Sequence, residues 1–182
     1  MNTKKLSTIA LIIAMLSIGA MISIPIGPVP ISLQSAFVII GGIIAGSRDS
    51  AIAQIVYLIA GLIGLPVFAG MQGGIHYLFS PTFGFLLGFI PAAWIVGWGY
   101  NEKKRKARIL SLIFANLVIY FLGIIYFYYI KNIYSGSDID LIRIFKMIVI
   151  PFIPGDIVKT LIAYNMGIRL EKILNKINLK LA

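Results

Sequence analysis

One stretch of the chain, Ile109–Ile130, is apolar along nearly its whole length and contains no charged residue. A helix rises about 1.5 Å per residue, and about 20 mainly apolar residues cross the roughly 30 Å hydrocarbon core of a bilayer. The stretch is long enough to do so. The sequence therefore predicts a transmembrane helix here, which requires a chain adapted to lipid.

Five further apolar stretches are recognisable along the chain. They are Leu6–Ile24, Ile31–Gly46, Ala51–Leu65, Thr82–Gly99 and one within Leu141–Leu174. Two of them, Ile31–Gly46 and Ala51–Leu65, are near the lower limit of about 17 residues for a span, and their small residues favour close helix packing in lipid. We expect an all-α membrane protein with six transmembrane helices, residues 1–182 forming one domain.

Composition agrees with a multi-pass protein of the cell membrane. Only 12% of the residues are charged and 59% are hydrophobic, whereas a soluble domain carries roughly 25% charged residues. The net charge of +10 comes from residues at the ends of apolar stretches, where they can meet anionic lipid rather than nucleic acid. With no cysteine and only one histidine, a thiol or metal site is not expected.

The distribution of basic residues predicts the orientation. Twelve of the 16 Lys and Arg residues fall on one side if the N-terminus is cytoplasmic: Lys4, Lys5, Arg48, Lys103, Lys104, Arg105, Lys106, Arg108, Arg169, Lys172, Lys176 and Lys180. The positive-inside rule then places both termini in the cytoplasm. Most prolines and the loop Pro66–Pro81 lie at the outer ends, where we expect either a binding surface or helix breaks that the topology requires.

The segment Pro151–Lys159 is the most informative for function. Pro154 suits the first turn of a helix, which places Asp156 in that turn and Lys159 on the same face. Ionisable groups near the membrane boundary usually face a cavity or a partner. The two residues form a structural ion pair at a helix start, or Lys159 reaches the interface. Alternatively, the pair is a site for a small planar ligand with N–H donors and a carbonyl, such as a urea or amide.

Other side chains are candidates at the same level. Polar and aromatic candidates for a substrate site are Gln34, Gln72, Tyr57, Thr82 and Phe85. In the first stretch, Ala10 and Ala14 form a stripe of small residues that favours close helix contact, with a partner or within the chain. There is no P-loop, nucleophile elbow or dinucleotide-binding motif, so we do not expect an enzyme.

Four segments together resemble the BioY family, the substrate-binding S components of energy-coupling factor (ECF) biotin transporters. The segments are PVPISLQ at 28–34, YLIAGLIGLPVFAG at 57–70, SPTFGFLLGF at 80–89 and PFIPGDIVK at 151–159. The resemblance covers nearly the whole chain. It implies an S-component-like bundle that captures biotin from outside, together with a transmembrane coupling subunit and two ATPase subunits.

The resemblance also implies roles for particular residues. Asp156 and Lys159 would contact biotin, and Ala10 and Ala14 would contact the coupling subunit; no cofactor is implied beyond biotin as bound substrate. Where relatives usually have Gly-Pro-Thr-Gly-Gly-Tyr, this chain has Ser-Pro-Thr-Phe-Gly-Phe at 80–85, which changes the expected pocket wall. The alternatives are an S component for another vitamin, a solitary carrier or channel, and a membrane enzyme or assembly factor.

Overall fold

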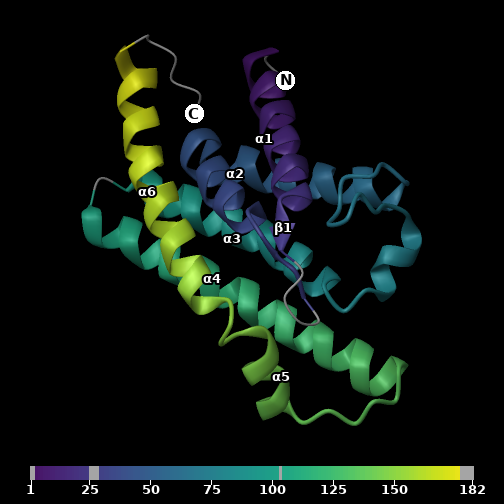
Figure 1. Ribbon diagram of the computed structural model, residues 1–182. Helices are drawn as coiled ribbons and strands as arrows, with labels where there is room; N and C mark the ends of the chain where they lie inside the picture. Colours follow the sequence, from purple (N-terminus) through teal and green to yellow (C-terminus); the bar gives the residue numbers. More distant parts are fainter. Residues whose placement is uncertain (1–2, 25–28, 103, 177–182) are drawn as a thin grey trace.

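The computed structural model describes residues 3–24, 29–102 and 104–176, and these are mostly helical (Figure 1). The elements are α1 (Thr3–Met21), β1 (Ser23–Ile24), β2 (Ile31–Ser32), α2 (Gln34–Leu62), the 3-10 helix η1 (Ile75–Phe79), α3 (Phe83–Asn101), α4 (Arg105–Tyr128), the π-helix η2 (Tyr129–Tyr134), α5 (Leu141–Ile148) and α6 (Ile153–Lys176). The strands β1 and β2 form an antiparallel hairpin that pairs Ser23 with Ser32.

Among the described residues, four helical segments are long and apolar enough to cross a membrane. They are Thr3–Met21, Gln34–Leu62, Phe83–Asn101 and Arg105–Tyr134. The structure is thus mostly helical, as expected, whereas the number of six spans and the cytoplasmic termini stay predictions. The last apolar stretch is divided between α5, which has 8 residues, and α6, which has 24.

The stretches Ile31–Gly46 and Ala51–Leu65 do not form two helices separated by a loop. Both contribute to α2, which consists of two helical segments joined directly at Gly46. The φ and ψ angles of Gly46 are 73° and −179°, a conformation that residues with a Cβ atom rarely adopt. Just beyond it, the Ser50 hydroxyl donates to the carbonyl of Gly46 (2.6 Å) and to that of Ala93 in α3 (3.2 Å).

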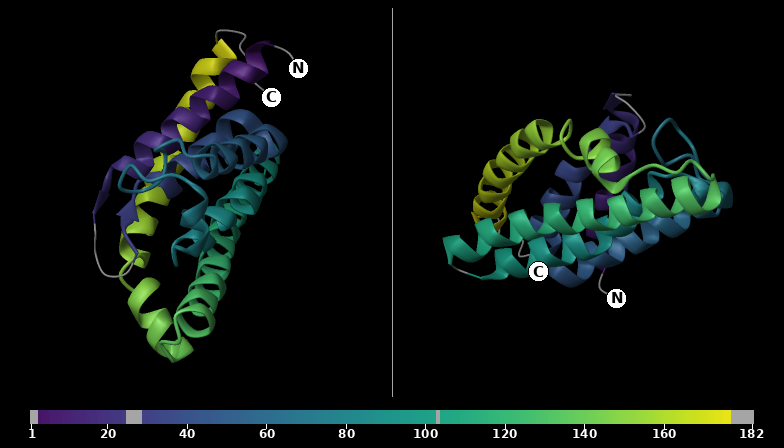
Figure 2. Two further views of the ribbon diagram at one scale, coloured as in Figure 1. Left: turned by 90° about the vertical axis from the view of Figure 1, so that its right-hand side faces the viewer. Right: turned by 90° about the horizontal axis from the view of Figure 1, so that it is seen from below.

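Helix α2 is the centre of the fold, because α1, α3 and α6 all pack against it. The core includes Leu16 of α1, Val38 and Ile39 of α2, Val96 of α3 and Ala163 of α6. Helices α3 and α4 form a second close pair. By contrast, the backbone of α6 lies apart from that of α4, and the chain passes from α4 to α6 through η2 and α5 (Figure 2, left).

The helix start predicted at Pro154 is confirmed. Helix α5 ends at Ile148 and α6 begins at Ile153, so Pro154 occupies the first turn of α6. Proline is tolerated there because the N–H groups of a first turn have no partner within the helix. This local rule places Asp156 and Lys159 at the start of α6.

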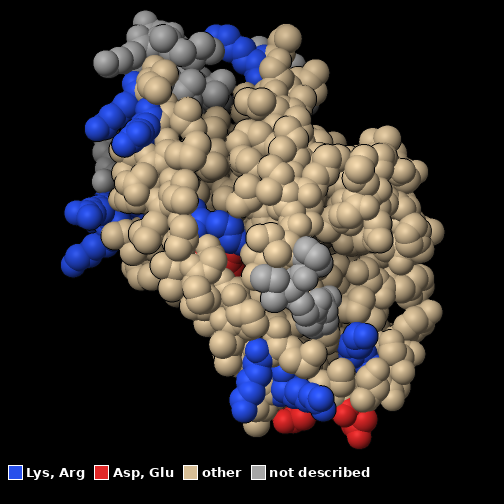
Figure 3. All heavy atoms as spheres, in the orientation of Figure 1, with Lys and Arg blue, Asp and Glu red and all other residues tan. Residues whose placement is uncertain are grey.

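Charged and apolar surfaces are separated in space. On the face shown in Figure 3, Lys and Arg gather at the upper and left rims and at the lower rim, and the broad band of other residues between them is interrupted by one small patch of basic and acidic atoms. Large apolar side chains are exposed on several helices. Leu11 of α1, Phe121 of α4 and Leu161 of α6, for example, have exposed fractions of 55%, 63% and 57%. The beginning of α1 and the end of α6 lie at the same end of the molecule (Figure 1).

Candidate functional site

A small cavity lies where the starts of α2, α3 and α6 approach α4. Of the residues predicted for a substrate site, it is lined by Gln34, Thr82, Phe85, Asp156 and Lys159. Its volume is about 60 Å³. Side chains from well-separated parts of the chain therefore converge on one place.

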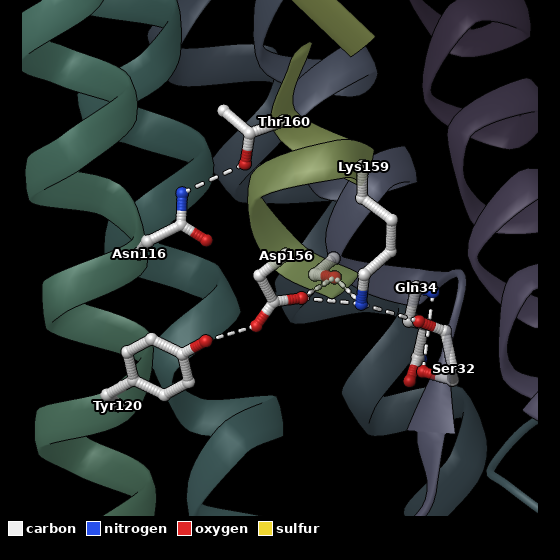
Figure 4. A network of polar contacts seen from close by, with 8 residues as sticks. Ser32, Gln34, Asn116, Tyr120, Asp156, Lys159 and Thr160 are labelled. Carbon is white, nitrogen blue, oxygen red and sulfur yellow. Dashed lines mark hydrogen bonds and ion pairs between the residues drawn. The ribbon is translucent and has the colours of Figure 1, made fainter. Parts of the chain in front are cut away.

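The ion pair between Asp156 and Lys159 occupies one wall of this cavity (Figure 4). The Nζ of Lys159 lies 2.5 Å from Oδ1 of Asp156, and both side chains are largely buried, at 12% and 13% exposure. The same Nζ donates to the carbonyl of Ser32 (3.0 Å) and to the hydroxyl of Ser35 (2.9 Å). All three N–H donors of the ammonium group thus have acceptors.

Asp156 is bound from the other side as well. The hydroxyl of Ser35 donates to its Oδ1 (3.3 Å), and the hydroxyl of Tyr120 in α4 donates to its Oδ2. Figure 4 shows this network running from α4 through α6 to the β2–α2 junction. Burying two charges is costly unless such additional hydrogen bonds are present. The network therefore keeps a charged, donor-and-acceptor pair next to an apolar cavity.

Two further hydrogen bonds fix the position of Gln34 on the polar side of the cavity. Nε2 of Gln34 donates to the hydroxyl of Tyr57 (2.6 Å), which donates to the carbonyl of Val67 (2.7 Å). Tyr57 itself is only 1% exposed and does not line the cavity. The structure thus places Tyr57 behind Gln34, where it orients that amide and ties it to the loop after α2.

The apolar wall comes from α3, α4 and the turn before α6. Its members are Phe85, Leu86, Phe89, Ile119 and Phe152. Thr82 adds a hydroxyl that shares hydrogen bonds with Ser80 (2.7 Å) and Tyr77 (3.2 Å). Of the two phenylalanines that depart from the usual family pattern, Phe85 lines the wall, whereas Phe83 packs with its ring centroid 5.6 Å from that of Tyr126.

Gln72 is not among the side chains that line the cavity. It is exposed on the loop after α2, and its carbonyl accepts from the N–H of Phe68 (2.9 Å). Its side chain was predicted at the site because the loop was expected at the same level as the Asp–Lys pair. In the structure the loop instead uses Gln72 to close its own turn.

Three groups of the network were missed from sequence: Ser32, Ser35 and Tyr120. The two serines flank Gln34, which was itself identified, so the segment 28–34 and its neighbour carried a usable signal. Tyr120 carried none, because an aromatic residue in an apolar helix usually marks packing or the membrane interface.

Ala10 and Ala14 are both exposed on α1. The opposite face of this helix, including Ile9, Ile12 and Leu16, is buried in the core. The stripe of small residues is therefore not used for packing within the described part of the chain.

A sequence model of the BioY family matches residues 1–176. The chain belongs to the BioY family. Among its relatives, the probable biotin transporter BioY of Pyrococcus horikoshii is 37% identical over 171 residues, covering 94% of this chain and 98% of the relative. The biotin transporter BioY of Thermotoga maritima is 35% identical over 161 residues, covering 88% and 91%.

The fold has a solved counterpart. The chain is similar to the S-component for biotin from an ECF-type ABC transporter, whose crystal structure was determined at 2.1 Å. The TM-score is 0.78, with 27% sequence identity, and the likeness covers 94% of this chain and 95% of the other. The arrangement of helices around the cavity is thus that of an S-component.

Proposed function

We propose that this chain is the biotin-capturing S component of an ECF transporter, a single multi-pass domain of the cell membrane. The observation that carries the proposal is the buried Asp156–Lys159 pair beside an apolar cavity in a BioY-family fold. Energy for uptake would come from a separate transmembrane coupling subunit and two ATPase subunits, and the chain itself would not be an enzyme. Biotin would be its substrate, with no further cofactor.

The chemistry of the pair fits the ureido ring of biotin. This ring offers two N–H donors and one carbonyl acceptor, and Asp156 can accept the former while Lys159 donates to the latter. A carboxylate has about four lone-pair directions, and Ser35, Lys159 and Tyr120 use three of them. One direction on Oδ2 is therefore available for a ligand N–H. The alternative assignment pairs Lys159 with the valerate carboxylate of biotin.

Ligand entry must enlarge the cavity. Pockets that enclose drug-sized ligands have volumes of roughly 300–1,000 Å³, well above the 60 Å³ observed. The flexible side chain of Lys159 is the natural group to move, because a ligand carbonyl can replace the hydrogen bonds that Lys159 makes to Ser32 and Ser35. The apolar ring of biotin would then lie against Phe85 and Phe152.

Isothermal titration of the purified protein with biotin tests the proposal. We expect saturable binding of biotin and much weaker binding of other vitamins such as riboflavin or thiamine. Tight binding of another vitamin instead would assign the chain to a different S component, and no binding of any would contradict a capture function. Copurification with ATPase subunits distinguishes a modular transporter from a solitary carrier.

A further inference from the structure

A second, much larger hollow lies between α4 and α6 and adjoins the substrate cavity, with which it shares Tyr120 and Asp156. Its volume is about 800 Å³, and its walls are almost entirely apolar. Ile113 and Leu117 of α4 and Ile157 and Leu161 of α6 line it, and each is more than half exposed, between 51% and 57%. The hollow is thus a groove open to the surroundings of the bundle, which for a membrane protein are lipid.

One end of this groove is basic. Arg105, in the first turn of α4, lines it, and Lys104 and Lys106 are adjacent to Arg105 in the sequence. A negatively charged group is therefore favoured at this end and an apolar chain along the rest.

The lining of the groove runs along α4 from Arg105 to Ile124, and its part between Arg105 and Asn116 has the length of one membrane leaflet. Asn116 lies about 16 Å along α4 from Arg105, at ~1.5 Å per residue. Its amide donates to the hydroxyl of Thr160 (3.2 Å) and bridges the groove to α6. If Arg105 lies at the headgroup level, this bridge lies near the middle of the roughly 30 Å hydrocarbon core. A lipid acyl chain that enters the groove beside Arg105 would reach the Asn116–Thr160 hydrogen bond without leaving its own leaflet.

We propose that the α4–α6 groove binds an anionic glycerophospholipid, with an acyl chain in the groove and the headgroup phosphate at Arg105. The apolar walls match the acyl chain, the guanidinium matches the phosphate, and the distance to the bridge matches the leaflet. A zwitterionic lipid also carries a phosphate, but its attached ammonium group opposes the basic end. The proposal does not depend on which substrate the cavity binds.

Native mass spectrometry of the full chain, released from micelles that contain a lipid mixture, tests this site. The probes are phosphatidylglycerol and phosphatidylcholine with identical acyl chains. We expect at least tenfold preferential retention of one phosphatidylglycerol. Arg105→Gln should remove most of this preference, whereas Lys106→Gln, which deletes one positive charge beside the groove, should preserve it.

A second pair of variants tests the acyl chain. Leu117→Trp adds bulk inside the groove, and Leu110→Trp adds the same bulk at a position of similar exposure (55% against 52%) that does not line it. We expect Leu117→Trp alone to reduce retention of phosphatidylglycerol at least tenfold. Equal retention of both lipids, or equal effects of the two tryptophan substitutions, would show that lipid binds only nonspecifically around the protein. Either result would overturn the proposal. A dimer that Leu117→Trp disrupts would assign the groove to a second copy instead.

Discussion

The carboxylate of Asp156 accepts from donors on three helices: Ser35 of α2, Lys159 of α6 and Tyr120 of α4. Each of these contacts orients the carboxylate before any ligand arrives. A ligand N–H then meets an acceptor whose conformational freedom has already been lost, which lowers the entropic cost of binding. At the residue scale, the proposed binding of biotin would therefore depend on the geometry of this acceptor as well as on its charge.

Asp156→Asn tests this dependence. The substitution keeps the size of the side chain, but it replaces an acceptor oxygen with a donor and leaves Lys159 without a counter-charge. We expect biotin binding to weaken at least about tenfold, or about 1.4 kcal/mol, as measured by isothermal titration. The control is Asp138→Asn, which neutralises an exposed aspartate and should leave the affinity unchanged. An unaltered affinity in the Asp156 variant would remove that carboxylate from the site.

Lys159→Ala distinguishes the two orientations of biotin. If Lys159 donates to the ureido carbonyl, the variant should weaken biotin and biotin amide by similar factors, because both ligands keep that ring. Competitive titration with the two ligands measures this. If the variant loses affinity for biotin but binds the amide as the parent does, Lys159 meets the valerate carboxylate instead.

Sequence reasoning identified the parts of the site that local chemistry determines. Pro154 and the three-residue spacing of Asp156 and Lys159 are enough to place the pair on one face of a new helix. Tyr120 could not be found this way, because its contact joins two helices whose separation no local pattern encodes. Tyr57 was predicted to contact the substrate, whereas in the structure it lies behind Gln34 and does not line the cavity. Sequence alone does not distinguish a tyrosine that touches a ligand from one that supports a neighbouring polar group.

At the scale of the elements, the bend of α2 depends on contact with α3. A Cβ atom on Gly97 of α3 would lie 2.2 Å from the backbone N of Ser47 and 2.4 Å from the backbone C of Gly46. No residue other than glycine fits this approach without backbone movement. The sequence showed many small residues here and predicted two separate apolar stretches. The direct connection at Gly46 could not be predicted, because it depends on the contact with α3.

Gly97→Ala should therefore destabilise the fold. Forcing extra atoms into a well-packed interior typically costs about 1–3 kcal/mol, and here the neighbouring atoms are backbone. Thermal unfolding in detergent should show a lowered midpoint. The matched control is Gly155→Ala in α6, where an added Cβ meets nothing within 4 Å and alanine favours the helix. Equal midpoints for the two variants would contradict the close approach.

Helix α1 exposes its stripe of small residues to a partner. Ala14→Trp should block a close helix approach by volume alone, so we expect it to abolish assembly with the coupling subunit and ATP-driven uptake. Biotin binding to the isolated subunit should persist. Ile125→Trp, on an exposed position of α4, is the control for a bulky residue on the surface. Loss of binding in the Ala14 variant would instead indicate packing within the chain.

The whole molecule is predicted to have one orientation in the membrane, with both termini cytoplasmic. The chain has no cysteine, so a single introduced cysteine is the only thiol in it that can react with a label. Lys104→Cys should react with an impermeant maleimide only from the cytoplasmic side, whereas Gln72→Cys and Ser137→Cys should react only from outside. All three positions are exposed. The reverse pattern of labelling would contradict the orientation and, with it, an outward-facing site.

The hydrogen bond between Tyr120 and Asp156 has a mechanical consequence. With the bridge between Asn116 and Thr160, it joins α4 to α6 across a groove that is otherwise apolar. A ligand that donates to the open direction of Oδ2 of Asp156 would share this oxygen with Tyr120. Two donors on one oxygen weaken each other, so the bound ligand would loosen the hydrogen bond that joins the two helices. Capture would then weaken the contact between the two helices, and by reciprocity a force that parts them would strengthen the hydrogen bond to the ligand.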